Sequence, residues 1–114
     1  MENEQSYYPE FLNNLPDIES VFKGVNGNLL QGKESQLVFM EIDAIGDVLP
    51  HSHGAQWGVV LKGEMKLTID GVEKSYKNGD YYYIQSGVVH SAIFNSKVFL
   101  IDYFDDKGRY EVEK

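Results

Sequence analysis

Short apolar segments, rich in β-branched and aromatic residues, alternate with turn-forming residues along most of the chain after position 20. This pattern is typical of an all-β sandwich or barrel, and no stretch shows the periodicity of a useful amphipathic helix. The clearest hairpin joins residues 64–69 to residues 72–77, because Asp70-Gly71 readily adopts the positive φ angles of a type I′ turn. The sequence therefore predicts an all-β fold.

Five further strands are expected on the same grounds, over residues 36–43, 56–62, 80–85, 89–95 and 97–104. The dipeptide Asn78-Gly79 supplies a second turn, and the segments 44–50 and 86–88 are expected to be loops. No repeat or low-complexity tract interrupts this series of short strands.

The N-terminal end of the chain differs from the rest. The first 20 residues are polar and acidic, and Pro9 and Pro16 interrupt any long element, so residues 1–20 are expected to form an irregular arm. The remaining residues, 21–114, have the size of one domain with one hydrophobic core.

The segment 56–62 is apolar on both of its faces. Trp57, Val59 and Leu61 share one face, and Val60 lies on the other. A strand that is apolar on both faces is usually covered on both. In a one-domain β protein the second cover is another sheet or another subunit, and a twofold dimer is the simplest closed arrangement. We therefore expect a homodimer.

The charge of the chain narrows the choice of partners. Its formal net charge is −8, so nucleic acid and anionic membranes are not expected as partners. No apolar run approaches membrane-spanning length, and no basic segment followed by an apolar stretch opens the chain, so a cytoplasmic protein is expected. The chain has no cysteine, so any metal ion must take nitrogen and oxygen ligands.

Three histidines fall in or beside the turn-rich ends of strands. His51 and His53 lie two residues apart, so in an extended segment both imidazoles project from one face. Gln56 has the opposite parity, but a bulge at Gly54-Ala55 would return its carboxamide to the same side. A His-x-His pair is also common at surfaces, so its spacing alone leaves metal binding open.

Two segments resemble the conserved motifs of the cupin superfamily. Residues 46–56, Gly-Asp-Val-Leu-Pro-His-Ser-His-Gly-Ala-Gln, followed by Gly63, are similar to the first motif, and residues 79–90, followed by Asn95, are similar to the second. This resemblance implies a double-stranded β-helix, or jelly-roll, barrel. It also implies one divalent metal ion, held by His51, His53, Gln56 and His90.

Two departures from these motifs concern side-chain chemistry. Gln56 stands where the family usually has Glu, and Gln85 stands where it usually has Pro. Because Gln56 is neutral, the bound metal would keep its full positive charge and favour an anionic oxygen ligand. Zn, Fe, Ni, Mn and Co all suit three histidines with one oxygen ligand. We therefore expect one divalent metal ion and an anionic small molecule as partner.

A carboxylate lies inside the apolar segment 98–104. Burial there would raise the pKa of Asp102 and suit proton transfer, although pairing with Arg109 near the barrel mouth is an equal alternative. Asp102-Tyr-Phe104, followed by Arg109, resembles a cupin branch that ketonises 4,5-unsaturated uronates and also uses Gln as a metal ligand. The resemblance implies that Asp102 transfers a proton, Arg109 binds a sugar carboxylate and Phe104 forms a pocket wall.

Trp57 and Tyr83 are further candidates for contacts with a substrate. Together these features predict a metal-dependent enzyme that ketonises or isomerises a small anionic substrate, such as an unsaturated uronate or a keto acid. Two alternatives stay open: a non-catalytic sensor of a sugar or small acid, and a metal-dependent dioxygenase. One scaffold of this kind hosts many functions, so fold alone does not decide among them.

Overall fold

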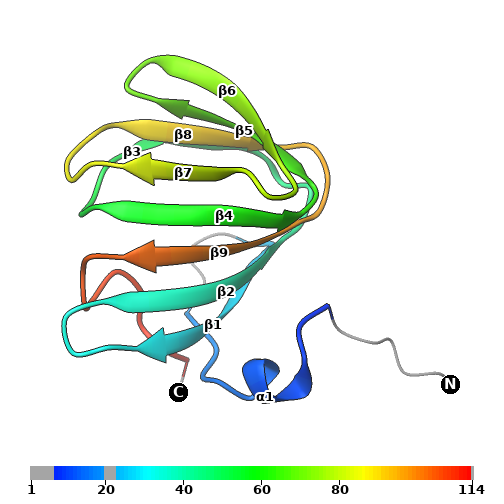
Figure 1. Cartoon of the computed structure of the whole chain (residues 1–114), viewed down its shortest axis with the longest axis vertical. Coiled ribbons are helices and arrows are strands. Elements are labelled where there is room, and N and C mark those ends of the chain that lie inside the picture. Colours follow the sequence, from blue (N-terminus) through cyan, green and yellow to red (C-terminus); the bar gives the residue numbers. More distant parts are fainter. Residues whose placement is uncertain (1–6, 20–22, 114) are drawn as a thin grey trace, which may run out of the picture.

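The computed structural model describes residues 7–19 and 23–113, and these residues form two antiparallel sheets with one short helix (Figure 1). The five-stranded sheet has the order β1-β2-β9-β4-β7 and the four-stranded sheet the order β3-β8-β5-β6. The strands are β1 (Val25–Gln31), β2 (Gln36–Ile42), β3 (Gly46–His51), β4 (Gln56–Lys62), β5 (Glu64–Ile69), β6 (Val72–Lys77), β7 (Tyr81–Ile84), β8 (His90–Phe94) and β9 (Val98–Phe104).

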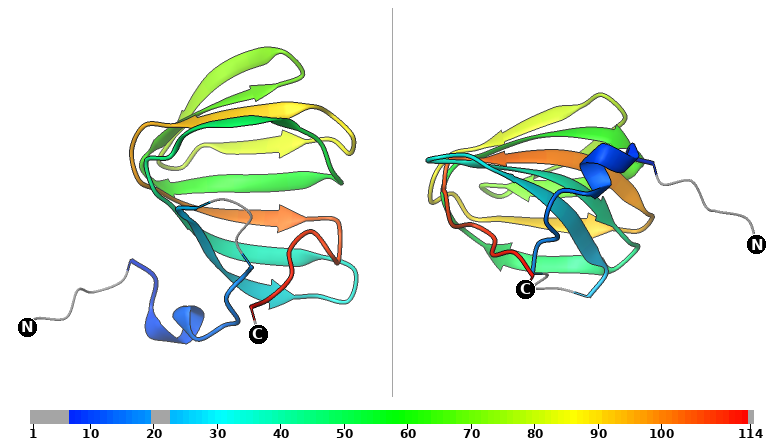
Figure 2. Two further views of the ribbon diagram at one scale, coloured as in Figure 1. Left: turned by 180° about the vertical axis from the view of Figure 1, so that it is seen from behind. Right: turned by 90° about the horizontal axis from the view of Figure 1, so that it is seen from below.

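The two sheets face each other and enclose the hydrophobic core (Figure 2). Alternation along β2 and β9 produces this core, because every second residue of both strands is buried while the residues between are less buried. Val38, Val60 and Val98 have no exposed surface at all. This arrangement confirms the predicted all-β jelly-roll barrel.

The predicted strands agree closely with the observed ones, but β1 and β3 had no individual prediction. The hairpin turn at Asp70-Gly71 is confirmed by positive φ angles at both residues, 51° and 82°. The loop expected over residues 44–50 was wrong, because β3 occupies most of it and pairs with β8. Its register shifts between Val48 and His51, and this irregularity removes the clean alternation by which a strand is recognised.

The N-terminal segment packs against the outer face of the five-stranded sheet. The buried Tyr8 hydroxyl donates hydrogen bonds to the main-chain oxygens of Met40 (2.7 Å) and Leu100 (3.1 Å). A single helical turn, α1 (Glu10–Asn13), follows it, and Ile18 then enters the core. None of the helices in the described part of the chain is long and apolar enough to cross a membrane.

The outer face of the five-stranded sheet is aromatic over β4, β7 and β9. As expected, alternate residues of β4 lie on opposite faces of the sheet, because Gly58 and Val60 are buried while Trp57 points outward. Trp57 is 42% exposed, and its ring stacks on the exposed ring of Tyr81, with 6.2 Å between the centroids. Tyr83 and Tyr103 are exposed as well.

Candidate metal centre

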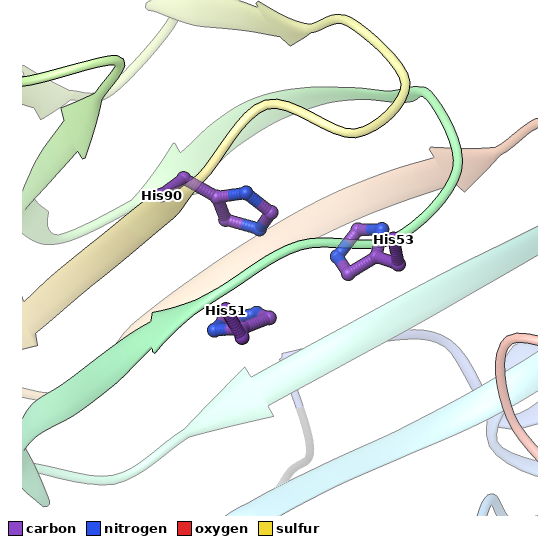
Figure 3. A group of neighbouring side chains, drawn as sticks. All are labelled: His51, His53 and His90. Atoms are coloured by element: carbon purple, nitrogen blue, oxygen red, sulfur yellow. The ribbon is translucent and has the colours of Figure 1, made fainter.

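The structure brings the three histidines together at one end of the barrel interior (Figure 3). His51 ends β3 and His90 begins β8, and these two residues are paired across the strands. His53 lies in the connection from β3 to β4, two residues beyond His51. The ring centroids of His51 and His53 lie 4.4 Å and 4.8 Å, respectively, from the centroid of His90.

Hydrogen bonds to main-chain carbonyls determine which nitrogen of each imidazole is free to bind a metal. The Nδ1 atoms of His51, His53 and His90 lie 2.9, 2.8 and 3.0 Å from the carbonyl oxygens of Leu49, Gly54 and Val88, respectively. A carbonyl only accepts hydrogen bonds, so each Nδ1 carries the proton and each Nε2 keeps its lone pair. Metal-binding histidines are commonly oriented in this way by a hydrogen bond on the second nitrogen.

The separation of these nitrogens suits a single ion. One potential ligand atom from each histidine lies within 4.8 Å of the other two. Nitrogen ligands about 2.0–2.1 Å from one ion lie up to about 4 Å apart, so small side-chain rotations complete the geometry. The three histidines can therefore hold a metal ion.

Burial keeps two of these imidazoles in the neutral form that binds metal. Burial, together with the charges of Arg109, His90 and His51, lowers the pKa of His53 to about 4, although the hydrogen bond to Gly54 opposes this change. Burial, followed by the charges of His51 and Arg109, also lowers the pKa of His90. At neutral pH a divalent ion therefore displaces no proton from His53 or His90.

Gln56 reaches the same cavity by a different route from the predicted bulge. The chain leaves the four-stranded sheet after His51 and enters the five-stranded sheet at Gln56, so these residues belong to different sheets. The connection is held at both ends: the Gly87 amide donates to the His53 carbonyl, and the Asp105 amide donates to the Ala55 carbonyl, each at 2.9 Å. Gln56 then lines the cavity with the three histidines.

Asp102 lies deeper in the barrel and is paired with a tyrosine that the sequence analysis missed. The Tyr82 hydroxyl donates to Asp102 Oδ1 at 2.5 Å, and both residues are about 95% buried. The pair spans β4 above Gly58, which is the register partner of both residues. A Cβ atom at Gly58 would collide with both side chains, so only glycine leaves room for this hydrogen bond.

Burial raises the pKa of Asp102 to about 6, although hydrogen bonds from Tyr82 and Gln56 and the charge of Arg109 oppose the rise. Burial, together with the neighbouring Asp102 carboxylate, raises the pKa of Tyr82 well above its ordinary value. Tyr82 therefore stays protonated and donates, while Asp102 can exchange a proton near neutral pH.

Arg109 enters the cavity from the segment after β9. Its guanidinium carbon lies 4.5 Å from the Tyr110 ring centroid and 5.7 Å from that of Phe104. Among the described residues, Arg109 Nε is the buried side-chain atom without a hydrogen-bond partner. The buried Gln36 anchors this segment, because its amide nitrogen donates to the carbonyls of Lys107 (3.1 Å) and Tyr110 (2.9 Å).

Comparison with known proteins shows which family the chain belongs to. Residues 38–102, more than half of the chain, match the profile of the cupin domain. The chain belongs to the cupin family. No curated protein sequence matches this cupin significantly.

Solved structures agree with that membership. An RmlC-like cupin from Shewanella frigidimarina has a TM-score of 0.73 at 27% identity, with 94% of each chain covered. KdgF from Halomonas sp. has a TM-score of 0.70 at 22% identity, covering 82% of this chain and 87% of that one. Oxalate decarboxylase from Bacillus subtilis has a TM-score of 0.70 at 19% identity, covering 84% of this chain and 28% of that one.

The interior of this cupin barrel forms a cavity that opens to solvent. The sequence-predicted residues His51, His53, Gln56, His90, Asp102, Phe104 and Arg109 all line it, together with Tyr82 and Tyr110, which the sequence analysis missed. Its other lining residues are apolar. A cavity with few, convergent polar groups is typical of a site for a small molecule.

Trp57 and Tyr83 depart from the expectation that they contact a substrate. They are register partners on β4 and β7, 42% and 56% exposed, and neither lines the cavity. The physical reason is strand parity, since the residues next to them, Gly58 and Tyr82, are the ones that face inward. The pocket-facing tyrosine of this strand is therefore Tyr82.

Proposed function

We propose that this cupin is a metal-dependent enzyme that acts on a small anionic substrate, with ketonisation of a 4,5-unsaturated uronate as the favoured reaction. One observation carries the proposal: a carboxyl group near its titration point, Asp102, and a guanidinium, Arg109, face the same cavity as three converging histidines. The pair also matches the sequence resemblance to the uronate-ketonising cupins, which made Asp102 the proton-transfer group.

The metal site is built from His51, His53 and His90, with the Gln56 oxygen as the proposed fourth ligand. Three neutral histidines and a neutral amide leave the charge of a divalent ion uncompensated, so it favours an anionic oxygen. When bound there, the metal supplies a Lewis acid that polarises an enol or carbonyl oxygen. Zn, Fe, Ni, Mn and Co all fit this donor set.

Arg109 is the proposed binding group for the substrate carboxylate. Cation–π contacts with Tyr110 and Phe104 hold the guanidinium in place, and the unpartnered Nε leaves a buried donor available. An arginine binds a carboxylate through two parallel hydrogen bonds, which fixes the position and the orientation of the substrate. Phe104 then forms the apolar wall beside the sugar ring.

Asp102 is the proposed proton-transfer group. Ketonisation of an enol moves the hydroxyl proton away and adds a proton at carbon, so a group that both accepts and donates near neutral pH is suited to it. A pKa of about 6 meets this requirement. The Tyr82 hydrogen bond holds the carboxylate in place during the exchange.

Loss of the unsaturated monosaccharide can be followed by its ultraviolet absorbance. Chelator-treated protein reloaded with each candidate metal should accelerate the loss, and Asp102→Asn should lower kcat, while Arg109→Lys should mainly raise KM. Tyr7→Phe, which alters an exposed side chain outside the cavity, serves as the control. If the wild type binds the sugar without accelerating its loss, the proposal is overturned in favour of a sensor.

Metal content provides a separate test. Protein purified without a nickel column should contain close to one divalent ion per chain, and His51→Ala and His90→Ala should lose it. Equal metal content in all three proteins would refute the site.

We also propose that two copies pair through the outer aromatic face made by Trp57, Tyr81, Tyr83 and Tyr103. A large exposed apolar patch is typical of an interaction site, and these four residues carry no charge. Two chains that each carry a net charge of −8 can meet there without bringing carboxylates together. The second copy is therefore the expected occupant.

Sedimentation equilibrium tests this pairing. The wild type should be a dimer, and Trp57→Glu should be a monomer. Leu49→Glu alters an even more exposed apolar residue, on the four-stranded sheet, and this variant should remain a dimer. A wild type that stays monomeric at all concentrations would overturn the proposal.

A further inference from the structure

The carboxamide of Gln56 has an oxygen that accepts hydrogen bonds or binds a metal and a nitrogen that donates hydrogen bonds. Gln56 and Gly58 are two residues apart on the inner side of β4, so Gln56 is one step along the strand from the point where Tyr82 and Asp102 meet. The three histidines line the same cavity as Gln56. The orientation of this amide decides whether an oxygen or a nitrogen faces a metal.

Hydrogen-bond chemistry settles which end faces the pair. Gln56, Asp102 and Tyr82 line the same cavity, and hydrogen bonding by the Gln56 side chain lowers the pKa of both Asp102 and Tyr82, as donation to their charged forms does. An ionised carboxylate only accepts, and the Tyr82 hydrogen is already donated to Asp102 Oδ1, so both contacts need the amide nitrogen as donor. The amide oxygen is then left at the other end, towards the histidines.

We infer that Tyr82 and Asp102 are positioning residues that hold the Gln56 amide with its oxygen towards the metal site. Asp102 thereby acts on the metal through Gln56, in addition to its proposed role in proton transfer. This inference rests on the proposed use of Gln56 as a ligand. It also explains why glutamine, rather than glutamate, suits this position.

A glutamate at position 56 would meet the same two partners with the wrong chemistry. Its carboxylate has no hydrogen to donate to Asp102, and two carboxylates in one buried site repel each other. Asp102 and Gln56 are therefore a matched pair of acceptor and donor. Exchanging the two roles, by Gln56→Glu together with Asp102→Asn, restores the match, because asparagine then donates to the new carboxylate.

The test is a Co²⁺ titration of chelator-treated protein, followed by visible absorption and checked by competition with Zn²⁺. In the wild-type background, the new asparagine oxygen of the Asp102→Asn variant still accepts the Tyr82 hydrogen, but its amide nitrogen replaces the oxygen that faces the Gln56 amide nitrogen. Two donors then meet, so Co²⁺ binding should weaken by about 10- to 100-fold, as loss of a ligand's hydrogen-bond partner typically does. In the Gln56→Glu background, the same Asp102→Asn change should strengthen Co²⁺ binding. This reversal of sign is the signature of the inference.

The alternatives give different patterns. If Asp102 acted only as a negative charge near the ion, its removal would weaken binding in both backgrounds. If it had no role in positioning, its removal would leave the Co²⁺ affinity unchanged. Either result would overturn the inference. A wild type whose Co²⁺ binding does not depend on His51 and His90 would instead overturn the proposed metal site, and the inference with it.

Tyr82→Phe provides a second variant that keeps the core intact, since the ring still packs edge-on against Tyr76, at 5.6 Å between centroids. It should weaken Co²⁺ binding by about 10-fold and change the absorption spectrum, because the ligand field depends on which Gln56 atom is bound. Tyr7→Phe removes a hydroxyl from an exposed tyrosine outside the cavity and outside the aromatic face, and it should change neither property. Equal behaviour of the two variants would contradict the role of Tyr82.

Discussion

Replacing Asp102 with asparagine is expected to stabilise the metal-free barrel at neutral and alkaline pH. Asp102 is 5% exposed, and burial raises its pKa from 3.8 to about 6. The charged carboxylate is therefore disfavoured in the folded protein relative to the unfolded chain. At about 1.4 kcal/mol per pKa unit, this rise of about 2 units costs about 3 kcal/mol of folding free energy at pH 8.

The sign of the pH dependence follows from the direction of the shift. The folded carboxyl binds its proton more tightly than the unfolded one, so the cost is fully present above pH 6 and declines as the pH falls towards 3.8. Asparagine keeps an oxygen to accept the Tyr82 hydrogen bond and carries no charge. Its advantage should fall from about 3 kcal/mol at pH 8 to about 1 kcal/mol at pH 4.5.

Urea denaturation of both proteins, with a chelator present, measures this difference at the two pH values. The low pKa of His53 affects stability in the same pH range, but it does so in both proteins, so it cancels in the difference. A wild type that is the more stable protein at pH 8, or a difference that does not change with pH, would refute the reasoning. Either result would mean that the buried carboxylate is fully compensated by its partners.

Three further changes should have distinct effects. Gly58→Ala should separate the Tyr82–Asp102 pair, so thermal unfolding should show a lower stability and metal titration a lower affinity. An unchanged metal affinity would contradict this expectation. Tyr8→Phe removes the single hydroxyl hydrogen that is shared between two main-chain carbonyls and should cost about 1–2 kcal/mol in urea denaturation, with metal binding unaffected. Gln36→Leu frees the segment that carries the guanidinium, so calorimetry should show weaker uronate binding but an unchanged metal affinity.

The sequence predicted the parts of this structure that local patterns encode. Most strands follow from alternating β-branched and aromatic residues, and the Asp70-Gly71 turn follows from the need for positive φ angles. The three histidines were assigned through the resemblance to cupin motifs, and the structure places them around one point. These predictions succeeded because the information lies within a few neighbouring residues.

The parts that failed depend on contacts between distant segments. Three consecutive tyrosines on β7 offer no local sign of which one faces inward, and the sequence analysis chose Tyr83 instead of Tyr82. A usable signal was Gly58 in the middle of an apolar strand, since an interior glycine often marks a close approach of other groups. The role of Gln36 was equally hidden, because the segment that it anchors, which includes Lys107 and Tyr110, lies more than 70 residues away along the chain.

The charges of the cavity connect the metal to the choice of substrate. Among the described residues that line it, Asp102 and Arg109 are the charged ones, so their charges cancel when Asp102 is ionised. A divalent ion would make the cavity strongly positive inside a chain whose net charge is −8. An anion should therefore bind much more tightly to metal-loaded protein, and by reciprocity it should tighten metal binding by the same factor. Calorimetric titration of a uronate with and without Zn²⁺ measures one side of this linkage, and titration of Zn²⁺ with and without the uronate measures the other.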